Sequence, residues 1–149
     1  MLHSADMNPK HLILAIVAVF VGVWVTDFLI HGVWLQSTYK ETMSLWRTDA
    51  EMQAHIGWML LGQFLMATTF VVLYAKGFAE KACPLCAVMY GLFMGLFSQA
   101  MTVIMYVVQP FPASLAVKWF IAGTVQGVLM GLIVFFVYKP KSASATPTA

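Results

Sequence analysis

Two carboxylate–histidine pairs lie at the edges of apolar stretches in this sequence. Asp27 and His31 are four residues apart, and Glu51 and His55 repeat that spacing further along the chain. Residues four apart share one face of a helix, so each pair would present both of its side chains together. Carboxylates and imidazoles are ligands that suit zinc, iron or manganese. The four residues therefore predict a site for a divalent transition metal if the fold brings the two pairs together.

The same side chains also allow a purely structural interpretation, which we favour. A charged group in hydrocarbon needs a partner, and Asp27 has one available in an ion pair with Lys118. Glu51 has the spacing of a capping box with Thr48 at the start of a helix. In this interpretation the histidines form hydrogen bonds near the membrane surface. Ligation of a haem by His31 and His55 is a further alternative.

The segment Cys83-Pro84-Leu85-Cys86 is the sharpest short motif in the chain. A thiol pair at the start of a helix is reactive because the helix dipole and its unpaired N–H groups favour the thiolate. The motif resembles the CPLC segment of DsbB-type disulfide oxidases, which are four-helix membrane proteins that pass electrons from thiols to quinone. That resemblance implies a membrane thiol–disulfide oxidoreductase that uses Cys83 and Cys86. The chain lacks the second cysteine pair of those enzymes, and an ordinary reduced pair is the alternative.

The elements that must position these groups are long apolar stretches. The chain has 149 residues, of which 61% are hydrophobic and 9% charged, and its mean hydropathy is +0.83. The stretches cover residues 12–35, 56–74, 87–108 and 115–138, and about 20 apolar residues suffice for a helix to cross a bilayer. The sequence predicts an all-α membrane protein, a four-transmembrane-helix bundle (residues 1–139) in a lipid bilayer. A net charge of +2 without a basic stripe argues against a nucleic-acid partner.

The flanking residues predict how the bundle is oriented. Five lysines (10, 76, 81, 139 and 141) fall at one end of the predicted helices, against two lysines and one arginine (40, 118 and 47) at the other. Because basic residues concentrate on the cytoplasmic side, we expect both termini inside, the N-in/C-in arrangement. A short interfacial helix is expected between the first two spans, within residues 36–47. The first span is expected to be an uncleaved anchor, and residues 140–149 a disordered tail.

Small and polar residues inside the spans predict how the helices touch. Gly91 and Gly95 are four residues apart in the third span, and Gly123, Gly127 and Gly131 continue that spacing in the fourth. Small residues at this spacing let two backbones approach closely. We expect a packing seam within one chain, with a homo-oligomer seam as the alternative. The remaining polar residues of the spans are expected to form interhelical hydrogen bonds: Gln63, Ser98, Gln99, Thr124 and Gln126.

A second resemblance covers most of residues 20–138. The segment Asp27-Phe28-Leu29-Ile30-His31-Gly32 and the later Leu45-Trp46-Arg47 are similar to small bacterial four-helix membrane proteins that are known only as a domain of unknown function. This resemblance implies the fold and a multi-pass location in the bacterial inner membrane, and it implies no activity. We therefore expect a non-enzymatic accessory subunit of a larger membrane complex, or a small carrier. The metal-binding and thiol–disulfide functions are kept as alternatives.

Overall fold

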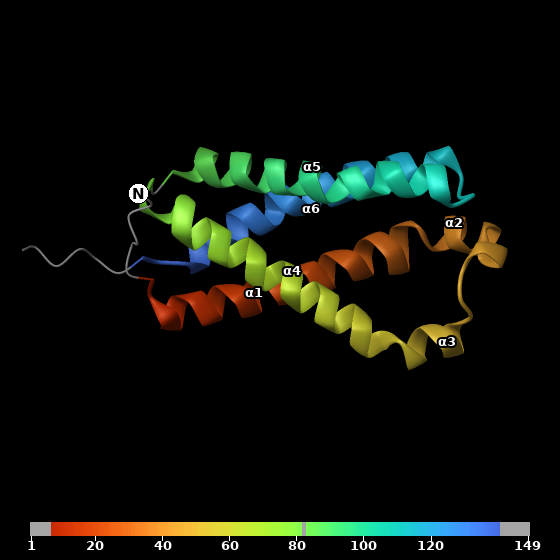
Figure 1. The fold of residues 1–149 in the computed structure, drawn as a ribbon, viewed down its shortest axis with the longest axis horizontal. Helices are drawn as coiled ribbons and strands as arrows, with labels where there is room; N and C mark the ends of the chain where they lie inside the picture. The colour runs from red at the N-terminus through yellow and green to blue at the C-terminus, as the bar shows by residue number, and fades with distance from the viewer. Residues whose placement is uncertain (1–6, 82, 141–149) are drawn as a thin grey trace, which may run out of the picture.

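The computed structural model describes residues 7–81 and 83–140, and within them the only regular secondary structure is helical. Four helices are long and apolar enough to cross a membrane: Pro9–Trp34, Ile56–Gly77 (α4), Pro84–Val108 (α5) and Ala113–Val137 (α6). The first comprises α1 (Pro9–Asp27) and a π-helical segment. Figure 1 shows the four running along the long axis of the molecule. The prediction of four membrane-crossing helices therefore holds by length and composition, and the tail beyond Pro140 lies outside the described residues.

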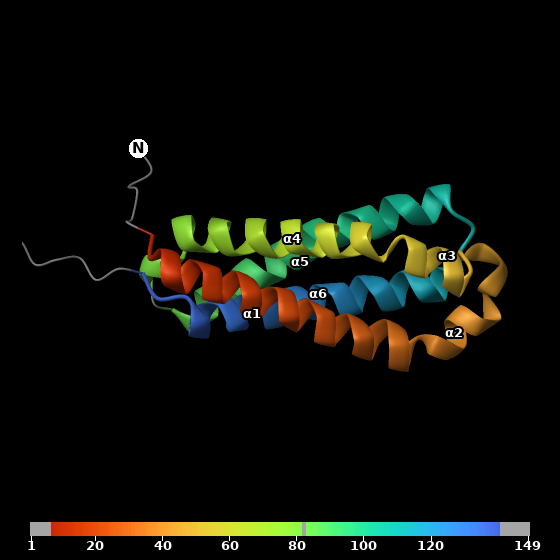
Figure 2. The same ribbon diagram turned by 90° about the horizontal axis from the view of Figure 1, so that it is seen from below.

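The two ends of the bundle are built differently. Figures 1 and 2 show the start of α1, the start of α5 and the end of α6 together at one end, which we call the terminal end. The opposite end carries α2 (Gln36–Glu41) and α3 (Asp49–Ala54), and we call it the α2–α3 end. Between these two short helices lies a 3₁₀ turn, Met43–Leu45. The short helix predicted between the first two spans is therefore present, as α2 followed by this turn.

Local sequence explains where several helices start. The Asn8 side chain accepts a hydrogen bond from the backbone N–H of His11, and Pro9 opens α1, where its missing N–H costs nothing. Thr48 and Glu51 form the predicted capping box at the start of α3, each side chain bonding the backbone N–H of the other residue.

Beyond Asp27 the first helix widens into a π-helix, Phe28–Trp34, which the sequence did not predict. At its end the backbone N–H of Leu35 bonds the carbonyl of Ile30 at 2.9 Å, a five-residue step in place of the usual four. Such wide turns are rare and often lie at functional sites. Here the π-helix contains His31, so the α-helical spacing assumed for Asp27 and His31 does not apply to this segment.

Helices α5 and α6 pack along their glycines. A methyl group on Gly127 would lie 2.6 Å from the carbonyl oxygen of Gly91 and 2.7 Å from the Cα atom of Gly95. On Gly131 it would collide with the backbone of Ala87. These contacts join two helices of the same chain, as the preferred interpretation of the glycine spacing expects. Gly123 differs from the others, because its close neighbour is the Gln99 side chain.

The remaining helices pack around α1. Small and medium side chains of α1, α4 and α6 form one buried core: Ala15, Val19, Val23, Ala67, Val71, Met130 and Val134. Near the terminal end, α4 and α5 meet through aromatic rings, with the Phe70 and Tyr90 centroids 4.8 Å apart. Figure 1 shows α4 leaving α5 from there and running obliquely toward α3. The bundle is therefore closed at the terminal end and splayed between α4 and α5 beyond it.

Candidate functional site

Asp27 joins three helices inside the apolar part of the bundle. Its Oδ1 accepts a hydrogen bond from Nε2 of Gln126 on α6, and its Oδ2 accepts one from Nε2 of Gln63 on α4, both at 2.7 Å. The Gln126 amide also donates to the Thr26 hydroxyl at 2.7 Å. Both carboxylate oxygens are thus occupied by amide donors, in a region where an unpaired carboxylate would be costly.

The predicted ion pair between Asp27 and Lys118 is replaced by other contacts. The Lys118 ammonium donates instead to the Thr38 hydroxyl on α2 at 3.3 Å. Lys118 precedes Gln126 by eight residues on α6, or about 12 Å along a helix axis. The lysine therefore lies nearer the α2–α3 end, where the short helix offers it an oxygen, and the glutamine lies at the depth of the carboxylate.

The Gln63 side chain donates a hydrogen bond to Asp27 but leaves its own carbonyl oxygen unpaired within the part of the chain that the structure describes. Its Oε1 atom is buried and has no hydrogen-bond partner among the described residues. Leaving a buried acceptor unpaired costs about 1–3 kcal/mol. This part of the site is therefore held in a polar arrangement that is not optimal for stability alone, which is common where a site serves binding.

A second cluster of polar side chains lies around Tyr39, toward the α2–α3 end. Its hydroxyl accepts a hydrogen bond from Nε1 of Trp119 at 2.7 Å and lies 2.6 Å from Nδ1 of His31. Burial raises the pKa of Tyr39, the bond from Trp119 opposes that rise, and the charge of Asp27 adds to it. The hydroxyl thus keeps its proton at neutral pH and can donate it to the imidazole.

The four predicted metal ligands are dispersed. In the described ranges, no three His, Cys, Asp or Glu side chains lie where they could hold a metal ion together. Glu51 bonds within its capping box, and Nδ1 of His55 lies 2.7 Å from the Glu51 carbonyl oxygen. Asp27 and His31 lie at the end of the first span, and Figures 1 and 2 show α3 well separated from it.

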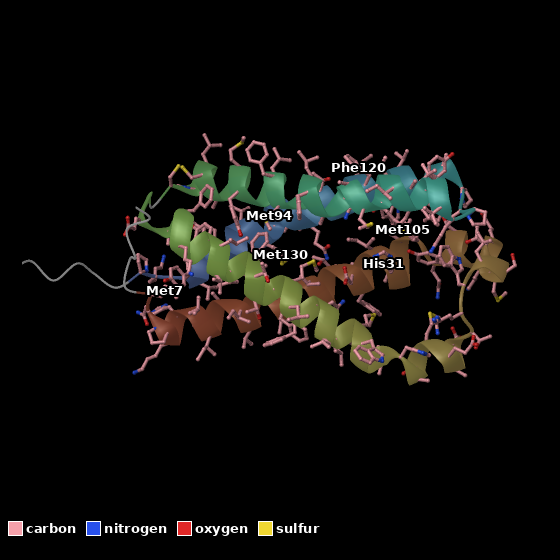
Figure 3. The ribbon with its side chains drawn as sticks, in the orientation of Figure 1. Met7, His31, Met94, Met105, Phe120 and Met130 are labelled. Atoms are coloured by element: carbon pink, nitrogen blue, oxygen red, sulfur yellow. The ribbon has the colours of Figure 1, made fainter. Side chains whose placement is uncertain are left out.

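Two adjoining cavities lie in the splayed region. The larger has a volume of about 390 Å³, and apolar side chains of all four long helices line most of it: Val19, Val23, Leu65, Met66, Phe70, Met94, Phe97 and Met130. Thr69 of α4 and Ser98 of α5 also line this cavity. Leu65 and Phe97 are more than half exposed, so this cavity opens sideways between α4 and α5. Figure 3 shows Met94 and Met130 in the middle of the bundle.

The smaller cavity has a volume of about 170 Å³, and we call it the polar cavity because polar and apolar groups share its wall about equally. It shares two wall residues, Gly123 and Gln126, with the larger one. Its other walls are Ile30, His31, Gln99, Thr102, Trp119 and Ala122. His31 lies nearer the α2–α3 end than Met130 does (Figure 3). Because Gln126 also bonds Asp27, one side chain connects the half-buried carboxylate to both cavities.

The polar residues of the spans behave in two ways. Gln63 and Gln126 form the interhelical bonds that the sequence predicted. Ser98 and Thr124 instead donate to carbonyls of their own helices, and Gln99 accepts a bond from Thr102 on its own helix. Sequence reasoning identified these polar groups but did not connect Asp27 to the two amides. The spans contain three glutamines (63, 99 and 126), and nothing in the sequence indicated which two of them would reach the carboxylate.

The thiol pair lies at the other end of the molecule. Cys83 is the N-cap of α5, its sulfur accepts a hydrogen bond from the Cys86 backbone N–H at 3.1 Å, and Pro84 occupies the first helical position. This arrangement is the helix start that the motif predicted. The start of α5 lies at the terminal end (Figure 1), and neither cysteine lines either of the two cavities.

Comparison of the chain with protein-family models, with curated proteins and with solved structures gives no match.

Proposed function

We propose that this multi-pass membrane protein binds a lipophilic small molecule between α4, α5 and α6 and acts as a small carrier for it. The observation that supports this function is the 390 Å³ cavity, open sideways between α4 and α5. Pockets that hold small molecules usually measure about 300–1,000 Å³, with mostly apolar walls and a few polar groups. A lateral opening would admit a molecule directly from the hydrocarbon of the bilayer.

The contacts of Asp27 support a structural role. Each of its oxygens accepts a hydrogen bond, one from Gln63 on α4 and one from Gln126 on α6, and these bonds hold the carboxylate between the two helices. In our proposal the carboxylate fixes the position of α4 and α6 around the cavity. It is a structural anchor of the binding site.

We further propose that both termini face the cytoplasm, in the bacterial inner membrane. Four lysines of the described residues (10, 76, 81 and 139) lie toward the terminal end, which supports this orientation through the positive-inside rule. The polar cavity would then lie in the outer half of the bilayer.

The proposed function is tested by uptake into phospholipid nanodiscs that contain the purified chain. The probes are radiolabelled pentadecane and 2-pentadecanone, and empty nanodiscs give the uptake by lipid alone. We expect saturable uptake of at least one probe. Ser98→Phe, which fills the cavity, should abolish it. Val107→Phe on the same helix should not, because Val107 is 84% exposed and lies outside the cavity wall. Uptake equal to that of empty nanodiscs for both probes would contradict the proposal.

The contact between the two cysteines favours a second candidate function, thiol–disulfide exchange. The Cys86 N–H directed at the Cys83 sulfur is a donor that stabilises negative charge there. In such an exchange Cys83 and Cys86 would form a disulfide while a partner's disulfide is reduced to two thiols. Trapping both thiols in intact cells tests it, and a pair that stays reduced and unreactive would rule it out.

A further inference from the structure

The polar cavity offers hydrogen-bond donors at its wall. Gln99 accepts a bond from Thr102 through Oε1, at 2.7 Å. Its Nε2 has no acceptor in the described part of the chain, and the residue lines the cavity. The amide N–H₂ group of Gln99 is therefore available to an oxygen of a bound molecule.

Gly123 makes room for this amide. A methyl group on Gly123 would lie 2.5 Å from Cδ of Gln99 and 3.1 Å from its Cγ. Alanine at this position would therefore push the Gln99 side chain aside. The obstacle is a flexible side chain rather than backbone, so the helices themselves could stay in place. Gly123 thus differs from the other glycines of α6, because its missing side chain leaves space for the Gln99 amide.

His31 supplies a second donor through its contact with Tyr39. Trp119 donates to the Tyr39 oxygen, which leaves the Tyr39 proton for Nδ1 of His31, 2.6 Å away. A neutral imidazole that accepts at Nδ1 carries its own proton on Nε2. This nitrogen has no protein partner within residues 7–81 and 83–140, and His31 lines the same cavity as Gln99.

The charge around the cavity selects against an anionic group. Its wall contains neither lysine nor arginine, and the nearby ammonium of Lys118 is directed at Thr38. Gln126 lies between the cavity and the Asp27 carboxylate, whose charge would repel a phosphate or carboxylate in this low-dielectric region. The matching group is neutral and accepts hydrogen bonds.

We infer that the lipophile carries a neutral carbonyl head, which the Gln99 amide and the His31 imidazole hold in the polar cavity while its hydrocarbon chain fills the apolar one. This inference rests on the proposed function and adds the chemical class of the ligand to it. The two cavities adjoin at Gly123 and Gln126, and the inference places the head of one molecule in the smaller cavity and its chain in the larger. A carbonyl oxygen accepts two hydrogen bonds, one for each donor.

The test compares 2-pentadecanone with pentadecane, which differs from it by the carbonyl alone, in nanodiscs that contain the full chain. We expect the ketone to bind more tightly by about fivefold for each hydrogen bond formed. Gln99→Met should remove much of this preference, so that the affinities for the ketone and for pentadecane become nearly equal. Gln109→Met at the C-cap of the same helix is the control, because Gln109 lies outside both cavity walls. Gly123→Ala should act like Gln99→Met, since it displaces the same amide.

The outcomes separate the inference from the proposed function. Saturable and equal binding of the two probes, unaffected by Gln99→Met, would overturn the carbonyl head and leave the proposed function standing. Displacement of the ketone by lysophosphatidic acid at lower concentration than by methyl myristate would overturn the neutral head. Displacement by methyl myristate at the lower concentration supports it and extends the class to esters. Failure of both probes to bind saturably would overturn both proposals.

Discussion

Asp27 and Gln126 are 99 residues apart in the chain, yet the carboxylate Oδ1 of one accepts a 2.7 Å hydrogen bond from the amide of the other. Gln63 adds the equivalent bond to Oδ2. These contacts tie α1 to α4 and α6 at the point where the two cavities begin. Because lipid provides no hydrophobic attraction between helices, such polar contacts and close packing must hold the bundle together.

Asp27→Asn should lower the free energy of unfolding by about 1 kcal/mol, because a polar group left unpaired in a half-buried site costs less than the roughly 1–3 kcal/mol of a fully buried one. Asparagine has a single acceptor oxygen, so one of the two glutamine amides would face another donor. Denaturant titration in detergent, followed by circular dichroism, measures the change. Asp49→Asn removes the same charge at an exposed residue and is the control. Equal losses in the two variants would show that charge, rather than the amide contacts, accounts for the effect.

Gly127→Ala should destabilise the bundle by about 1–3 kcal/mol, because overpacking against rigid neighbours forces the helices apart. The added methyl would meet the backbone of Gly91 and Gly95, which cannot move aside as a side chain can. Thermal unfolding in detergent measures the effect. Gly62→Ala is the matched control, since a methyl there has nothing within 4 Å. That variant should be neutral or more stable, by up to about 1 kcal/mol. Similar melting temperatures for both variants would contradict the close α5–α6 contact.

Sequence reasoning predicted the elements of this fold better than their contacts. Hydropathy predicted four long helices because a bilayer admits only chains whose backbone bonds internally. The Thr48–Glu51 capping box and the Cys83 helix start followed from local chemistry. The partner of Asp27 did not, because several polar residues lie at similar depths and helix rotation and crossing decide which of them meet. The π-helix around His31 has no marker in the sequence that we identified.

Acidification should weaken the start of α3. Hydrogen bonds from the Thr48 backbone N–H and hydroxyl lower the pKa of Glu51 from its ordinary value of 4.5. A lowered folded-state pKa means that the contribution to stability is fully present above pH 4.5 and is lost as the pH falls through the folded value. Faster exchange of the Thr48 amide hydrogen below that pH is the expected result. An NMR titration of the Glu51 carboxyl that gave a pKa above 4.5 would contradict the capping box.

The proposed orientation predicts which side of the membrane the thiols face. Cys83 and Cys86 lie at the terminal end, so they should be cytoplasmic if the termini are. A membrane-impermeant maleimide should then leave them unlabelled in intact cells and label them after the inner membrane is permeabilised. A cysteine introduced by Ser44→Cys, in the 3₁₀ turn between α2 and α3, should show the opposite pattern. Labelling of Cys83 or Cys86 in intact cells would show the opposite orientation, with the terminal end outside the cytoplasm.

The most direct measurement of the central claim locates the bound lipophile on the chain. Nanodiscs that contain the protein would be irradiated with a 2-pentadecanone derivative bearing a diazirine at its chain end, and the labelled residues identified by mass spectrometry. We predict labels on the apolar cavity wall, at Phe70, Met94 and Met130. Exposed residues outside the cavity, such as Phe93 and Val107, should carry little. A label spread evenly over the lipid-facing residues, unchanged by Ser98→Phe, would contradict the binding site.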